Sequence, residues 1–185
     1  MKRRTLDVLW LLHRPPEPGG TREQRAAWNA LVAGAKAGCA PVVLAETPPA
    51  AWRELQAAYG GRGMELRPGW TASDEAFLSR LRAELRRRRF DAVVVSGAEA
   101  ASRWLLRARM AAPEALIACH LPDPDALTAA RAGEGPSAAA ARREAARRAL
   151  SQADEVWCDD ARGLAAARAL LRGLPAPAVT LTPVP

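Results

Sequence analysis

The chain has 185 residues, of which 49% are hydrophobic and 25% charged, a balance that predicts one folded domain with a real core. This composition excludes an intrinsically disordered chain, which would be poorer in apolar residues. The formal net charge of +7 comes almost wholly from arginine, because Lys2 and Lys36 are the only lysines. The arginines are spread along the chain, often beside glutamates. We therefore expect a solvated surface with no specific nucleic-acid partner and at most weak contact with an acidic membrane surface.

Short apolar runs alternate with helical patterns along the whole chain. The first helix begins at Thr21, which forms a capping-box pattern with Gln24, and ends before Gly38. Pro68 limits pairing in one short strand, which is therefore expected at an edge of the sheet. In chain order, the expected strands are residues 5–13, 40–47, 63–69, 90–97, 114–120, 154–160 and 178–185, and the expected helices are residues 21–37, 49–59, 73–89, 98–110, 136–153 and 161–173.

This alternation predicts an α/β protein, a Rossmann-like doubly wound parallel sheet of about six or seven strands with helices on both faces. The central strand order expected for such a fold is 3-2-1-4-5-6. We treat residues 1–185 as a single domain. Ligands bind such sheets outside the carboxyl ends of the strands, so the segments that follow strands are the candidates for a site.

The segment PPEPGGTREQR, residues 15–25, is the first of these. Gly19 and Gly20 allow a ligand to approach the backbone closely, and the helix that follows presents unpaired N–H groups. Arg22 adds positive charge for an anionic group, whereas Glu23 already neutralises the helix terminus. Taken alone, the segment is also compatible with an ordinary connection between a strand and a helix.

His120 follows the apolar run ALIAC and precedes LPDPD, so it lies at the carboxyl end of a strand. An imidazole there can donate a hydrogen bond or handle a proton, or it can be satisfied by loop carbonyl groups. Ser96, Gly97 and Glu99 follow another buried strand. Cys119 adjoins His120 along the strand and points to the opposite face, which argues against a nucleophile–base pair. The two histidines of the chain have no clustered carboxylates or cysteines, so no metal site is predicted.

Cys39, Cys119 and Cys158 are scattered in or beside apolar stretches and form neither a disulfide framework nor a zinc-binding spacing. Asp7 interrupts the apolar run that follows the basic start, and no small-residue cleavage site comes after it. No apolar run approaches the roughly 20 residues needed to span a bilayer. We expect a cytoplasmic protein and leave open peripheral contact with the inner face of the membrane.

Five segments stand in a recognisable order: the opening strand with PPEPGG before a helix, FDAVVVSG, ALIACH ending in His120, REAARRALSQADEVWCDD, and AVTLTPVP. In this order they resemble the amino-terminal, acceptor-side domain of GT-B glycosyltransferases of the family 4 (group 1) type. The resemblance covers essentially the whole chain through short motifs. It implies half of a GT-B fold, acting in the transfer of a sugar from a nucleotide-sugar donor.

In that family the glycine-rich loop approaches phosphate or sugar, and the histidine lies near the reaction centre. With this context the opening segment is interpreted as a ligand-facing loop. The partners implied are a sugar or lipid-linked acceptor and a donor-binding domain in cis or in trans. The candidate residues are His120 as catalytic, and Gly19, Gly20, Arg22, Ser96, Gly97 and Glu99 as substrate-binding, the last three from their place after a strand.

One departure from the family concerns the donor. The family holds its nucleotide sugar mainly in a second Rossmann-like domain, in which two glutamates are separated by seven intervening residues. Glu46 and Glu54 have that spacing, but they follow the second strand of the first domain, and we interpret them as coincidence. The expectation is therefore an enzyme half with no cofactor of its own, which binds the nucleotide-sugar donor only with a second domain. A non-catalytic interaction domain and a small complete nucleotide-using enzyme remain open alternatives.

Overall fold

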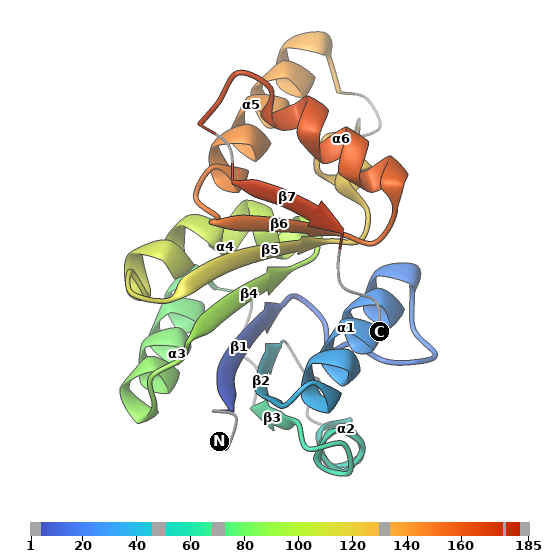
Figure 1. Ribbon diagram of the computed structural model, residues 1–185. Coiled ribbons are helices and arrows are strands. Elements are labelled where there is room, and N and C mark those ends of the chain that lie inside the picture. Colours follow the sequence, from blue (N-terminus) through green and yellow to red (C-terminus); the bar gives the residue numbers. More distant parts are fainter. Residues whose placement is uncertain (1–4, 46–50, 68–72, 130–133, 176, 182–185) are drawn as a thin grey trace.

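The computed structural model describes residues 5–45, 51–67, 73–129, 134–175 and 177–181. Seven parallel strands form one sheet in the order β3-β2-β1-β4-β5-β6-β7, with helices on both faces (Figure 1). The order confirms the predicted Rossmann-like fold. The elements are β1 (Leu6–Leu12), α1 (Arg22–Lys36), β2 (Cys39–Ala45), α2 (Trp52–Gly60), β3 (Glu65–Arg67), α3 (Asp74–Arg87), β4 (Ala92–Ser96), α4 (Ala98–Ala111), β5 (Leu116–Leu121), the 3₁₀ helix η1 (Pro124–Leu127), α5 (Pro136–Leu150), β6 (Glu155–Cys158), α6 (Ala161–Leu171) and β7 (Ala178–Leu181).

Each predicted helix and strand is present, most of them shorter than expected by a few residues. The last strand is described only to Leu181, since residues 182–185 lie outside the described part of the chain. The 3₁₀ helix η1 was not predicted. It begins at Pro124, whose ring fixes the φ angle that a first helical turn needs. Of the coincidental glutamate pair, Glu54 is exposed on α2 and Glu46 lies outside the described residues.

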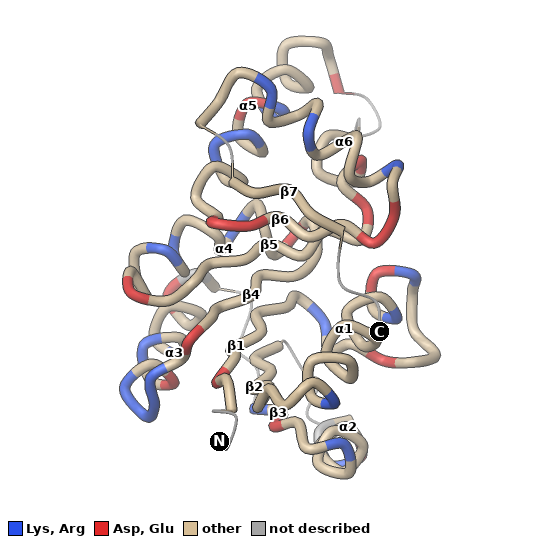
Figure 2. The backbone as a smooth tube through the Cα atoms, in the orientation of Figure 1, with Lys and Arg blue, Asp and Glu red and all other residues tan. Residues whose placement is uncertain are grey.

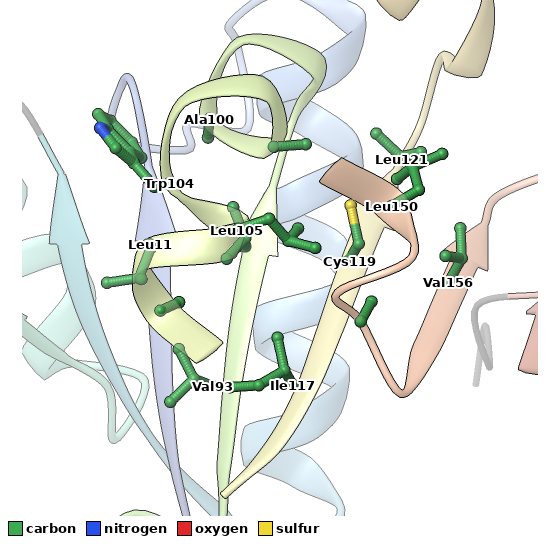
Figure 3. Packing of buried hydrophobic residues seen from close by; sticks show 14 of the residues in the cluster. Leu11, Val93, Ala100, Trp104, Leu105, Ile117, Cys119, Leu121, Leu150 and Val156 are labelled. Carbon is green, nitrogen blue, oxygen red and sulfur yellow. The ribbon is translucent and has the colours of Figure 1, made fainter. Parts of the chain in front are cut away.

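The two faces of the sheet have separate cores. Helices α1 and α2 cover one face, where Trp28 of α1 packs edge-to-face on Tyr59 of α2. Helices α3 to α6 cover the other face, and this core is the larger one. There Phe77 of α3 and Trp104 of α4 stack with ring centroids 4.7 Å apart and planes at 11°. The alanines of α4 let that helix approach β4 and β5 closely, as the packing around Trp104 and Leu105 shows (Figure 3).

Charged residues lie mainly on the helices and the connections beside them, and arginines gather at the C-terminal end of α3 (Figure 2). Arg86 and Arg87 lie in that last turn, where the negative end of the helix dipole stabilises their positive charge. Cys119 and Cys158 are buried, and burial raises the pKa of both thiols, that of Cys158 to about 11. Their position agrees with the packing role expected for them. In the part of the chain that the structure describes, no helix is long and apolar enough to cross a membrane.

A polar clamp joins the start of β6 to β5 and α4. The Asp154 carboxylate accepts a hydrogen bond from the backbone N–H of Ile117 at 2.7 Å and lies 2.6 Å from the Arg109 guanidinium. Partial burial alone would raise the pKa of Asp154, but the hydrogen bonds to Arg109 and Ile117 and the positive charge of Arg109 lower it overall. The clamp therefore stabilises the folded state when Asp154 is ionised.

Asp154→Asn is expected to lower the free energy of unfolding at neutral pH by about 1 kcal/mol, because an amide cannot keep both charge-assisted hydrogen bonds. The folded-state pKa lies below the unfolded one, so the stabilisation is present above the unfolded pKa. It is lost as the pH falls through the folded pKa. Urea unfolding of both proteins at neutral pH and through an acid series measures this. A stability difference that does not shrink in acid would contradict it.

Candidate functional site

Three polar side chains meet at the carboxyl ends of β4, β5 and β6. Ser96 ends β4 and lies opposite His120 of β5 in the sheet register, and Asp159 follows β6 directly. Ser96 Oγ lies 2.8 Å from His120 Nδ1, and His120 Nε2 lies 3.0 Å from Asp159 Oδ1. The parallel sheet thus aligns Ser96, His120 and Asp159 in one hydrogen-bonded chain, which we name the Ser–His–Asp chain.

The direction of these hydrogen bonds follows from the tautomer of His120. In the neutral Nε2–H tautomer, Nε2 donates to the Asp159 carboxylate and Nδ1 accepts from the Ser96 hydroxyl. The imidazole is therefore satisfied by two side chains and not by loop carbonyl groups. His120 is 0% exposed, and the ring of Trp10 packs edge-to-face against it with centroids 5.8 Å apart. His120 contacts the Ser96 side chain, and Ser96 lines a cavity.

That cavity has a volume of about 210 Å³ and lies between the end of β1, the first turn of α1 and the first turn of α4. Ser96, Gly97 and Glu99 line it, so the structure brings these three predicted residues together. The other lining residues are Leu12, His13, Arg14, Thr21, Glu23, Gln24, Ala27 and Ala100.

Glu23 of α1 sits on the N-terminus of α4. Its Oε1 accepts a hydrogen bond of 2.9 Å from the backbone N–H of Ala98, the first residue of that helix. Gly97 has a φ angle of +97°, and a Cβ atom there would lie 2.5 Å from Glu23 Oε1. Only glycine allows both this backbone conformation and this close approach.

Glu99 forms the other acidic wall of the cavity. Its Oε2 lies 3.3 Å from His13 Nε2, and its Oε1 lies 3.7 Å from the guanidinium of Arg103. The Glu99 side chain is 56% exposed, so it keeps access to solvent and to a ligand in the cavity. Glu99 and Glu23 thus place two carboxylates beside the Ser96 hydroxyl.

The opening segment is held by its own side chains. The hydroxyl of Tyr59 donates to the carbonyl of Pro16 at 2.8 Å, and Gln24 Nε2 donates to that of Pro15 at 3.0 Å. Gly19 and Gly20 belong to this connection, and neither lines the cavity beside Ser96. They lie at the same end of the sheet as His120, because Gly20 belongs to the connection that leads from the carboxyl end of β1 to α1. In the sheet, β1 lies two strands from β5.

Arg22 lies away from Ser96. Its Nη2 forms an ion pair of 3.0 Å with Asp160, the N-cap residue of α6. Both residues line a second cavity of about 260 Å³, which Asp125 and Arg162 also line as an ion pair of 3.2 Å. The structure therefore does not bring Arg22 together with Ser96 and His120.

The sequence did not identify two residues of the site, Asp159 and Glu23. Asp159 stood near the end of the expected strand 154–160, and nothing in its spacing pointed to His120. Glu23 was interpreted as neutralising the terminus of its own helix, whereas it accepts from the terminus of α4. Over the described ranges, no group of three or more His, Cys, Asp or Glu side chains is arranged to hold a metal ion.

The seven-stranded parallel sheet is consistent with half of a GT-B fold. No protein-family model matches the sequence, and no curated protein matches it significantly. The fold is similar to that of Anabaena Alr3699/HepE in complex with UDP, with a TM-score of 0.61 and 10% identity over 96% of this chain. For the same protein in complex with UDP and glucose, the TM-score is 0.60 and the identity 13% over 95% of this chain. The chain spans only 44% and 43% of the length of those two chains.

Proposed function

We propose that this chain is the acceptor-side domain of a glycosyltransferase, which acts on a sugar or lipid-linked acceptor together with a donor-binding domain in cis or in trans. In this proposal, the cavity beside Ser96 receives the acceptor, and the donor-binding domain brings the nucleotide sugar over the carboxyl ends of the strands. Weak contact with an acidic membrane surface stays a prediction that rests on the net charge of +7.

The observation that carries the proposal is the match to HepE. Nearly the whole chain matches less than half of a protein that was crystallised with UDP and with glucose. A second observation supports it, because the polar cavity lies at the carboxyl ends of the strands, where doubly wound sheets bind their ligands. The sequence motifs that resemble the acceptor-side domain of family 4 point to the same half of such an enzyme.

The Ser–His–Asp chain gives its members different roles in this proposal. Ser96 is the member that contacts the acceptor, because it lines the cavity. His120 is a positioning residue, since its buried ring orients the Ser96 hydroxyl and is itself oriented by Asp159. Glu99 accepts hydrogen bonds from acceptor hydroxyl groups, and Gly97 allows Glu23 to reach the same cavity.

Binding of sugars by the purified chain tests the proposal. We expect glucose to shift the ¹⁵N-amide resonances of Gly97 and Glu99 saturably, because both residues line the cavity. Ser96→Ala should weaken this binding, whereas Ser137→Ala, at the exposed start of α5, should leave it unchanged. Glucose is the first probe, followed by disaccharides that extend it.

Two outcomes would overturn the assignment. The absence of any shift of these resonances with glucose or a disaccharide, at concentrations where sugars bind weakly to other proteins, would contradict an acceptor site. Saturable shifts confined to the far edge of the sheet, around Arg67 and Arg80, would place the sugar in the cavity beside β3 instead.

A further inference from the structure

We infer that the cavity beside Ser96 accepts a neutral, hydroxyl-rich sugar and excludes phosphorylated sugars, because Glu23 occupies the position that a ligand anion would take. This inference rests on the proposed function and narrows its acceptor to one chemical class. It follows from the donors and acceptors that the cavity presents and from the charges around it.

Glu23 acts as an internal anion at the start of α4. The N-terminus of a helix attracts negative charge, and the backbone N–H of Ala98 would be a donor for a bound phosphate. That N–H already donates to Glu23 Oε1 at 2.9 Å. The absence of a side chain at Gly97 lets the carboxylate lie against the backbone there. A phosphate would have to displace Glu23 or lie beside its negative charge.

Two arginines close to the cavity, Arg22 and Arg25, already have partners of their own. Arg22 pairs with Asp160 at 3.0 Å, and Arg25 donates to the carbonyl of Gly20 at 2.6 Å. Of the residues that line the cavity, Arg14 is the one arginine, against the two carboxylates of Glu23 and Glu99. His13 also lines the cavity, and its Nε2 is directed to Glu99. These charges do not favour an anion.

The remaining polar groups present acceptors to the cavity. In the neutral Nε2–H tautomer of His120, the Ser96 hydroxyl donates to Nδ1, so Ser96 offers only its lone pairs to a ligand. The carboxylates of Glu23 and Glu99 can only accept. One N–H of the Gln24 amide donates to the carbonyl of Pro15 at 3.0 Å. A ligand that binds Ser96 and the two carboxylates must therefore bring donors. Sugar hydroxyl groups do so, whereas an ionised phosphate brings acceptors.

The test compares glucose, glucose 6-phosphate and inorganic phosphate by ¹⁵N NMR at Ala98 and Glu99. For the wild type, we expect saturable shifts with glucose, binding of glucose 6-phosphate weaker by about tenfold or more, and none of inorganic phosphate. Glu23→Ala frees the Ala98 N–H, so inorganic phosphate should now shift that resonance and the preference against glucose 6-phosphate should shrink. Glu144→Ala removes the same charge from the exposed face of α5 and should change neither result.

Glu23→Gln keeps the shape of the side chain and removes its charge, so it provides a second test of the inference if the Glu23→Ala protein does not fold. It should relieve part of the discrimination against glucose 6-phosphate. Equal or tighter binding of glucose 6-phosphate by the wild type, or a phosphate-induced shift of Ala98 in it, would overturn the inference and leave the proposed function standing. If no sugar of either class binds any of these proteins, the inference and the proposed function fail together.

Discussion

Trp104→Ala is expected to lower the free energy of unfolding by about 3–5 kcal/mol, the range typical of removing a large aromatic side chain from a core. Trp104 is 0% exposed and stacks on Phe77 with centroids 4.7 Å apart, so its removal leaves a cavity between α3, α4 and the sheet. The neighbours Leu105 and Ala108 belong to the same α4 helix and cannot move in to fill the space without shifting that helix.

Urea unfolding followed by circular dichroism measures this loss. Met110→Ala is the control on the same helix, because Met110 is 74% exposed and its truncation should change stability by no more than about 0.5 kcal/mol. Similar effects of the two substitutions would show that Trp104 does not lie in the core described above.

His120→Ala is expected to lower the free energy of unfolding by about 2–4 kcal/mol and to abolish the glucose-induced shifts at Gly97 and Glu99. The substitution leaves a cavity and removes one hydrogen-bond partner from both Ser96 and Asp159. Without His120, the Ser96 hydroxyl is free to rotate and no longer presents its lone pairs to the cavity.

A double-mutant cycle separates the Ser–His–Asp chain from simple packing. If His120 and Asp159 stabilise each other, Asp159→Ala should cost much less in the His120→Ala background than in the wild type. His13→Ala, whose side chain is 27% exposed, should cost less stability than His120→Ala. Additive losses for His120 and Asp159 would contradict the coupling, and unchanged glucose shifts in a folded His120→Ala protein would contradict the positioning role.

The sheet could be predicted from the sequence because each strand carries its own local pattern. The apolar runs VVLA of β2 and VVV of β4 are buried on both faces, and the capping box at Thr21 marks the start of α1 as expected. Rules for doubly wound folds then supply the strand order. The 3₁₀ helix at Pro124 was missed, since one short turn carries no periodic pattern.

The site could be predicted only in outline, because its contacts join distant parts of the chain. His120 and Asp159 are 39 residues apart, and Glu23 and Ala98 are 75 residues apart, so neither pairing leaves a trace in local spacing. The fold predicts that residues after strands share one end of the sheet, and this placed Ser96 and His120 correctly relative to each other. It does not specify which side chains pair. Arg22, expected beside the ligand, pairs with Asp160, 138 residues away.

Incubation of the purified chain with UDP-glucose and an acceptor sugar tests most directly whether it is the acceptor-side part of a glycosyltransferase. Catalysis between two domains needs groups from both sides to orient the donor and to stabilise the charge that develops on the leaving diphosphate. The chain alone is therefore expected to release no UDP above background and, by calorimetry, to bind UDP-glucose weakly or not at all. Tight binding of UDP-glucose, or steady release of UDP without any added domain, would contradict this and identify the chain as a complete enzyme.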